Sequence, residues 1–232
     1  MKKKQLTVRL AALFLVAVTA VGLTGCKQEL EESTENTEYL AAYEGYVQSV
    51  LDTNYHGEFD DYMAITGATK EQASNINEAH AVNLTEQLAE QYDIHLGQLP
   101  PEIGDTLVEI CSELYKKASY SVDEVQKDGE TVYVNISIKP IDFLEPASDA
   151  VAEYTSKFND RAKAGEFEKM TESEYENEYA EGILEVLQDV VKTVGYADQV
   201  TYRIKIQYNA ETGMSYIGDD ALDAINQLIL AE

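Results

Sequence analysis

Cys26 is the residue whose type and position point to the most definite chemistry. It follows Leu23, Thr24 and Gly25 at the end of the only long apolar run in the chain. A thiol at this position could be a core residue, one half of a disulfide or a site of covalent modification. The preceding segment and the second cysteine of the chain decide between these possibilities.

The second cysteine, Cys111, lies on a predicted apolar stripe. Pro100-Pro101 suits the start of a helix, and apolar residues follow at spacings of three and four: Ile103, Leu107, Ile110, Leu114 and Ala118. Cysteine on such a face behaves as a small hydrophobe, whereas a catalytic thiol needs an electropositive, partly exposed site. We therefore predict that Cys111 is a core residue, which leaves no internal disulfide if Cys26 is modified.

The three histidines, His56, His80 and His95, share no spacing typical of metal ligands. His80 stands four residues from both Ile76 and Leu84, which predicts a core histidine on the apolar side of a helix. The chain also lacks the motifs of phosphate loops, dinucleotide-binding turns, zinc proteases and serine hydrolases. The sequence therefore predicts no metal site and no cofactor.

Glu58 and Glu166 are the candidates for acid–base catalysis. Each follows a glycine at the predicted end of a helix, in the tripeptides Gly57-Glu58-Phe59 and Gly165-Glu166-Phe167. Paired carboxylates that hydrolyse a glycosidic bond face each other across about 5 to 10 Å. An envelope hydrolase using these residues is the alternative to a non-catalytic function.

The first 25 residues have the three zones of an export signal. Three lysines and Arg9 form a basic start, a twelve-residue apolar stretch interrupted only by Thr19 runs from Leu10 to Val21, and small residues follow. Twelve residues rise only about 18 Å as a helix, whereas about 20 residues are needed to span a bilayer. The segment 1–25 therefore predicts a cleaved signal peptide more strongly than a transmembrane helix.

The residues before Cys26 resemble the lipobox of bacterial prolipoproteins, in which a hydrophobic residue and two small ones precede a cysteine. The resemblance implies cleavage between Gly25 and Cys26. It also implies that the Cys26 thiol carries a diacylglyceryl group, with fatty acids such as palmitate, that holds the chain at the outer side of the cell membrane. Two acyl chains anchor a protein durably, whereas one binds only marginally.

The charge distribution narrows the possible partners. The whole chain carries a net charge of −26, and the 13 basic and 43 acidic residues after Cys26 leave −30 on the exported part. Nucleic-acid phosphates and anionic headgroups repel such a surface, which excludes nucleic-acid binding. Residues 26–38 are polar and acidic, so we expect the lipidated cysteine to be followed by a flexible tether.

The folded part, residues 39–232, is expected to be α+β. Amphipathic helices precede two hairpins, of which the first turns at Asp128-Gly129 and the second at Glu211-Thr212-Gly213. Because an isolated hairpin is marginal in water, we expect both to share one four-stranded antiparallel sheet with helices on one face. Two tandem domains divided near residues 140–146 are the alternative.

Two short segments suggest an internal duplication. The stretches that begin at Tyr46 and Tyr154 align without a gap and end in the two Gly-Glu-Phe tripeptides. They predict two helix-helix-hairpin halves, about 39–145 and 146–232.

The order of these features resembles an uncharacterised family of exported lipoproteins of Gram-positive bacteria. The resemblance rests on the lipobox, the first Gly-Glu-Phe tripeptide, the segment "ITGATKEQA" from Ile65 and the segment "IKPIDF" from Ile138. It implies an extracytoplasmic location and transfers no catalytic residue. The layout is also similar to cystatin-like folds, which bind through one face of a sheet; this is an analogy of fold alone.

One group of polar residues could form a binding surface. Five residues alternate away from the predicted core on the two long strands: Tyr133, Asn135, Lys139, Arg203 and Lys205. Basic groups on an otherwise acidic protein favour an anionic partner, such as a carboxylate or phosphate of the envelope. We therefore expect a non-catalytic binding module for an envelope protein, peptide or anionic ligand. The alternative is that these residues only solvate the open face of the sheet.

Overall fold

The computed structural model describes residues 28–211 and 214–231, with side chains from residue 38 onward. The predicted signal peptide, Gly25 and Cys26 lie outside the described residues. The elements follow in this order: α1 (Gln28–Leu51), the π-helical turn η1 (Asp52–His56), α2 (Asp60–Thr66), α3 (Lys70–Gln91), α4 (Pro101–Tyr115), β1 (Ser119–Asp128), β2 (Thr131–Lys139), β3 (Ile141–Asp142), α5 (Leu144–Lys163), α6 (Glu172–Thr193), β4 (Gly195–Tyr196), β5 (Val200–Asn209), β6 (Met214–Ile217) and α7 (Asp219–Ile229).

The two predicted hairpins form one antiparallel sheet with the strand order β1-β2-β5-β6. β2 pairs directly with β5, so Val134 lies opposite Ile204 and Asn135 lies opposite Arg203. Strands from both halves of the chain therefore belong to one sheet, which rules out a division of the sheet between two tandem domains. The expected α+β fold is confirmed. A second, small sheet joins β3 to β4, and Ile141 of β3 also bridges to Leu230 near the end of the chain.

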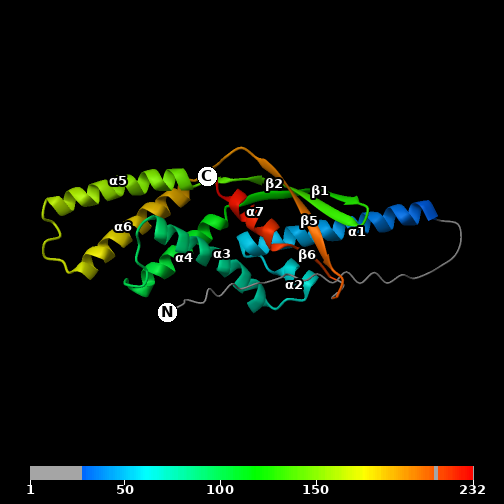
Figure 1. Ribbon diagram of the computed structural model, residues 1–232, viewed down its shortest axis with the longest axis horizontal. Coiled ribbons are helices and arrows are strands. Elements are labelled where there is room, and N and C mark those ends of the chain that lie inside the picture. Colours follow the sequence, from blue (N-terminus) through cyan, green and yellow to red (C-terminus); the bar gives the residue numbers. More distant parts are fainter. Residues whose placement is uncertain (1–27, 212–213, 232) are drawn as a thin grey trace.

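Alternation along the strands gives the large sheet one apolar face and one polar face. The buried residues of the two central strands point to the same side: Val132, Val134, Ile136, Ile138, Ile204 and Ile206. α1 contacts β1 and β2, and α7 contacts β2 and β5, so these two helices cover the apolar face (Figure 1). The opposite face carries no helix among the described elements.

The remaining long helices extend the core away from the sheet. α4 packs against α3 and α6, and α6 packs against α5, which makes the α5–α6 hairpin an arm at one end of the molecule (Figure 1). α3 and α6 each start with a capping box, formed by Thr69 with Gln72 and by Thr171 with Glu174. Each box satisfies two backbone donors that a helix start leaves unpaired.

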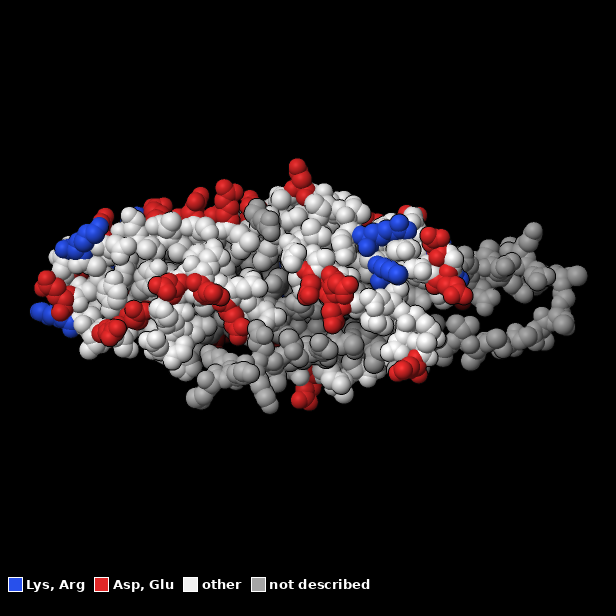
Figure 2. All heavy atoms as spheres, viewed as in Figure 1, with Lys and Arg blue, Asp and Glu red and all other residues white. Residues whose placement is uncertain are grey.

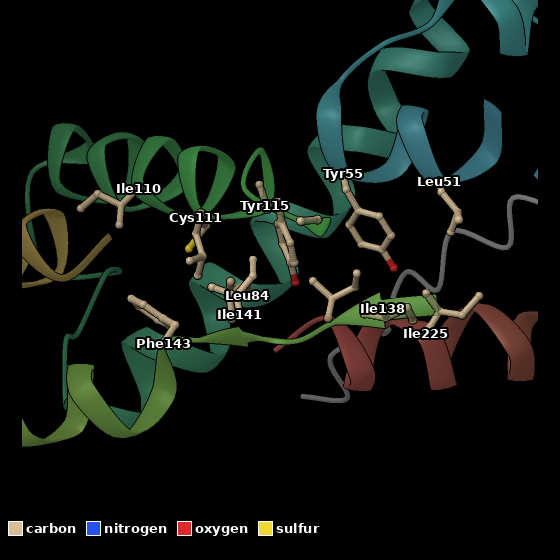
Figure 3. Close-up of a cluster of buried hydrophobic side chains, with 14 of the residues drawn as sticks. Leu51, Tyr55, Leu84, Ile110, Cys111, Tyr115, Ile138, Ile141, Phe143 and Ile225 are labelled. Carbon is tan, nitrogen blue, oxygen red and sulfur yellow. The ribbon is translucent and has the colours of Figure 1, made fainter. Parts of the chain in front are cut away.

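One continuous core connects the helices to the sheet. In Figure 3, Cys111 and Tyr115 of α4 point toward Leu84 of α3 and Ile141 of β3, and Tyr55 points toward Ile138 of β2 and Ile225 of α7. Cys111 is completely buried, which confirms the apolar stripe predicted for its helix. Its Sγ lies 3.4 Å from the Thr85 hydroxyl.

The segment expected to be a flexible tether differs from the expectation. α1 begins at Gln28, so residues 28–38 are helical rather than extended. Glutamate and glutamine have high helix propensity, and a helix already formed by the packed residues after Tyr39 can propagate backward at little cost. Composition alone indicates that these residues need no core, but it does not indicate that they are irregular.

The two helices that end in Gly-Glu-Phe occupy different positions. Gly57 and Gly165 both adopt positive φ, 69° and 82°, and each follows a helix as the aligned tripeptides predict. However, α1 packs against the sheet whereas α5 packs against α6. The shared tripeptide therefore marks a common way of ending a helix, and the two helices do not have equivalent neighbours.

Candidate functional site: the polar face of the sheet

The polar face of the sheet brings together most of the residues predicted to bind a partner. In the β2–β5 register, Tyr133 pairs with Lys205 and Asn135 pairs with Arg203. β1 adds a third column, in which Gln126 pairs with Tyr133 and Glu124 pairs with Asn135. The face therefore has two rows across three strands, Gln126–Tyr133–Lys205 and Glu124–Asn135–Arg203.

Arg203 is held in place by an aromatic ring and an amide. Its guanidinium carbon lies 4.0 Å from the centroid of the Tyr133 ring, and its Nη2 donates to Gln126 Oε1 at 3.4 Å. Gln126 Nε2 in turn donates to Glu124 Oε2 at 2.8 Å. An exposed cation–π contact contributes about 0.5–1 kcal/mol, enough to favour one orientation of the guanidinium without removing it from solvent.

Lys139 lies on the same face but apart from this group. It pairs with Ser119 at the far end of β2, four residues from Asn135. Four residues of a strand span about 13 Å. A small ligand bound at Arg203 would therefore not reach Lys139. The structure therefore brings Tyr133, Asn135, Arg203 and Lys205 together and separates Lys139 from them.

Sequence reasoning missed the acidic column that β1 adds. The register shifts between Val122 and Glu124, which is a β-bulge that leaves Asp123 without a paired residue. Asp123 accepts hydrogen bonds from Ser121 at 2.8 Å and from Ser137 of β2 at 2.6 Å, so it turns toward the polar face. The acidic dipeptide is visible in the sequence, but simple alternation cannot place two consecutive residues on one face.

The surface around the sheet is mainly acidic. Figure 2 shows several separate groups of acidic side chains on the face in view, and fewer basic side chains, which lie at one end and over the strands. Among the described residues, neither Arg203 nor Lys205 forms an ion pair with a carboxylate. Both cations are exposed and therefore available to a partner.

A second polar cluster lies where η1 meets the start of β1. The Tyr120 hydroxyl donates to Asp52 Oδ1 at 2.8 Å and lies 3.1 Å from His56 Nδ1, while His56 Nε2 lies 2.9 Å from the backbone oxygen of Ala118. Burial, followed by the hydrogen bond to the Asp52 carboxylate, raises the pKa of Tyr120. Tyr120 is therefore a neutral donor that fixes β1 to the end of α1, and it is a poor nucleophile or base.

The remaining candidates for covalent or acid–base chemistry do not form a site. Burial raises the pKa of the Cys111 thiol to about 11, so the thiolate needed for nucleophilic attack is absent near neutral pH. Glu58 lies between η1 and α2, whereas Glu166 lies at the far end of the α5–α6 arm (Figure 1). Ion pairing with Arg161, at 2.8 Å, lowers the pKa of Glu166, which is the reverse of what a general acid needs.

Within residues 28–211 and 214–231, no three histidine, cysteine or acidic side chains cluster closely enough to hold a metal ion. Over the same part of the chain, every helix is too short or too polar to span a bilayer.

No protein-family model matches this chain, and no curated protein matches its sequence. Among solved structures, it is similar in fold to a protein of Bacillus subtilis subsp. subtilis strain 168 described as a "putative lipoprotein (ycdA)". The TM-score is 0.56 at 17% sequence identity, and the match covers 87% of this chain and 60% of that protein. The chain thus corresponds to less than two thirds of the neighbour, and the likeness is one of fold.

Proposed function

We propose that this protein is a lipid-anchored, extracytoplasmic lipoprotein that binds an envelope component through the polar face of its sheet and has no catalytic activity. The residues from Lys2 to Cys26 support the anchor, because they combine a basic start, a short apolar run and a lipobox-like end. The fold shared with a Gram-positive protein described as a lipoprotein is consistent with that location.

The observation that carries the binding proposal is the placement of Arg203. Its guanidinium is stacked on Tyr133, lies across from Asn135 and stands two residues from Lys205 on β5. Within the described part of the chain it forms no ion pair with a carboxylate. Because the guanidinium is already oriented before binding, less side-chain entropy is lost when a ligand binds. A carboxylate or phosphate can accept hydrogen bonds from the guanidinium, the ammonium and the Asn135 amide together.

The separation of Glu58 from Glu166 supports the non-catalytic part of the proposal. Glycoside hydrolysis needs two carboxylates within about 10 Å, one of them with a raised pKa. Glu166 has the opposite shift, and it is engaged by Arg161.

The test is binding to isolated envelopes of a Gram-positive bacterium. We expect the lipid-free chain to co-sediment with the envelopes in a salt-sensitive way, because exposed charges are screened within about 8 Å at physiological ionic strength. The double substitution Arg203→Glu/Lys205→Glu should weaken binding by about tenfold, since two attractive contacts become repulsive.

The matched control is Lys157→Glu/Lys163→Glu on α5, which changes the net charge by the same amount at exposed positions. Unchanged binding by this control, together with unchanged thermal unfolding of both variants, would assign the effect to the sheet face. Equal loss in both variants would show that net charge alone governs binding, and no loss in either would remove the sheet face as the binding surface.

A further inference from the structure

The polar face of the sheet carries charges of opposite sign on its two outer columns. β5 presents Arg203 and Lys205, whereas the bulged part of β1 presents Asp123 and Glu124. All four side chains are exposed. The middle strand, β2, presents the neutral residues Tyr133 and Asn135 between them. The face therefore has a positive side along β5 and a negative side along β1.

The separation of the two columns follows from sheet geometry. Neighbouring strands lie about 4.8 Å apart, so columns on β1 and β5, two strands apart, are separated by about 10 Å. The row Glu124–Asn135–Arg203 displays this arrangement directly, because both outer residues are paired with the same asparagine. Arg203 and Glu124 do not neutralise each other, since each instead contacts Gln126.

We infer that the ligand of this face is itself dipolar: a short, extended peptide of about three residues with a free amino terminus and a free carboxylate. The inference rests on the proposed function, in which Arg203 and Lys205 take the anionic group. An extended chain rises about 3.3 Å per residue, so the two termini of a tripeptide are about 10 Å apart. The carboxylate then lies over β5 and the ammonium over β1.

The middle column suits the body of such a peptide. The Asn135 amide can donate to a peptide carbonyl and accept from a peptide N–H. A uniformly anionic polymer would satisfy β5 but would be repelled by Asp123 and Glu124. A single amino acid is too short to reach both columns.

The experiment is an NMR titration of the full exported domain with trialanine and its blocked forms. Because every charged contact is exposed, we expect a dissociation constant on the order of millimolar, with amide shifts confined to β1, β2 and β5. Acetylating the amino terminus and amidating the carboxyl terminus should each weaken binding about two- to fivefold. Acetylation without effect, or no saturable shift with trialanine, would overturn the inference.

Charge-exchange variants test the dipole itself. The pair Asp123→Lys/Glu124→Lys and the pair Arg203→Glu/Lys205→Glu should each weaken trialanine binding. All four substitutions together exchange the charges of the two columns and should restore binding to within about twofold, because the peptide can then bind in the reverse direction. No restoration in a folded variant that carries all four substitutions would contradict dipolar recognition.

The failure of this inference is distinct from the failure of the proposed function. If acetylation has no effect but amidation and Arg203→Glu both weaken binding, the face binds anions and its β1 column plays no part. If envelope binding is also insensitive to Arg203→Glu/Lys205→Glu, the proposed function fails as well.

Discussion

The buried polar side chains of the π-helical turn η1 form hydrogen bonds with specific partners. Asn54 Nδ2 donates to the backbone oxygen of Val50 at 2.7 Å, and Asn54 Oδ1 accepts from His80 Nε2 at 2.6 Å. Tyr55 donates to Asn226 Oδ1 of α7 at 2.6 Å. An unpaired polar group would cost about 1–3 kcal/mol at such a site, so these bonds fix how α1, α3 and α7 meet.

The stability of the protein should depend on pH through His80. Burial lowers the pKa of His80, and the charge of Asp223 offsets this only in part. The unfolded chain therefore binds a proton near pH 6.5, whereas the folded chain binds it only at lower pH. The stability contributed by neutral His80 is complete above about pH 6.5 and is lost as the pH falls toward its folded pKa.

Urea unfolding at pH 7 and pH 5 measures this contribution. The wild type should lose more stability between the two pH values than His80→Gln, which keeps a hydrogen-bond donor for Asn54 but does not titrate. Equal losses in the wild type and His80→Gln would show that His80 stays accessible to protons in the folded state.

At the residue scale, the sequence predicts apolar positions better than polar contacts. The spacing of His80 relative to Ile76 and Leu84 correctly predicts a histidine directed into the protein, where its ring packs near Tyr55 and Tyr115. The partner Asn54 could not be predicted, because the π-helical turn changes the helical period at the end of α1. The contact between Arg203 and Tyr133 likewise depends on strand register.

At the element scale, the α5–α6 arm depends on a close contact between its two helices. A Cβ added to Gly182 on α6 would overlap the ring of Tyr154 on α5. The same tyrosine lies in an aromatic cluster with Phe158 and Tyr179. Arg161 completes the arm by pairing with Glu178 of α6 at 2.9 Å.

Gly182→Ala should therefore destabilise the protein although alanine is the better helix former. Overpacking costs about 1–3 kcal/mol, more than the roughly 1 kcal/mol gained in helix propensity. Gly45→Ala on α1 is the control, since no atom lies within 4 Å of the added Cβ, and it should raise the free energy of unfolding. Urea denaturation measures both values.

A second substitution shows whether the helix contact is the cause. The double variant Gly182→Ala/Tyr154→Ala should be less unstable than the sum of its single variants, because removing the ring makes room for the new methyl group. Strict additivity of the two changes would contradict this explanation.

Strands and turns were more predictable than the way they assemble. Alternation from Val132 to Ile138 and the turn at Asp128-Gly129, where Gly129 has φ 59°, predict the first hairpin correctly. The β-bulge at Asp123 could not be predicted, because it depends on a hydrogen bond from Ser137 of the neighbouring strand. The helical residues 28–38 were missed because acidic composition is compatible with both helix and coil.

At the scale of the whole molecule, the two ends of the protein have different roles in the proposed function. α1 begins at Gln28, two positions after Cys26, and packs against β1 and β2. The α5–α6 arm lies at the end of the molecule opposite to the start of α1 (Figure 1). An anchor at Cys26 would therefore place α1 nearest the membrane and direct the arm away from it.

The most direct test of the anchored location is intact mass spectrometry of the protein from bacterial membranes. We expect a chain that begins at Cys26 and carries the added mass of a diacylglyceryl group, and we expect Cys26→Ala to abolish that mass and release the protein from the membrane fraction. A mature amino terminus at another residue, or an unmodified Cys26, would contradict the lipid anchor and with it the proposed place of this protein at the cell envelope.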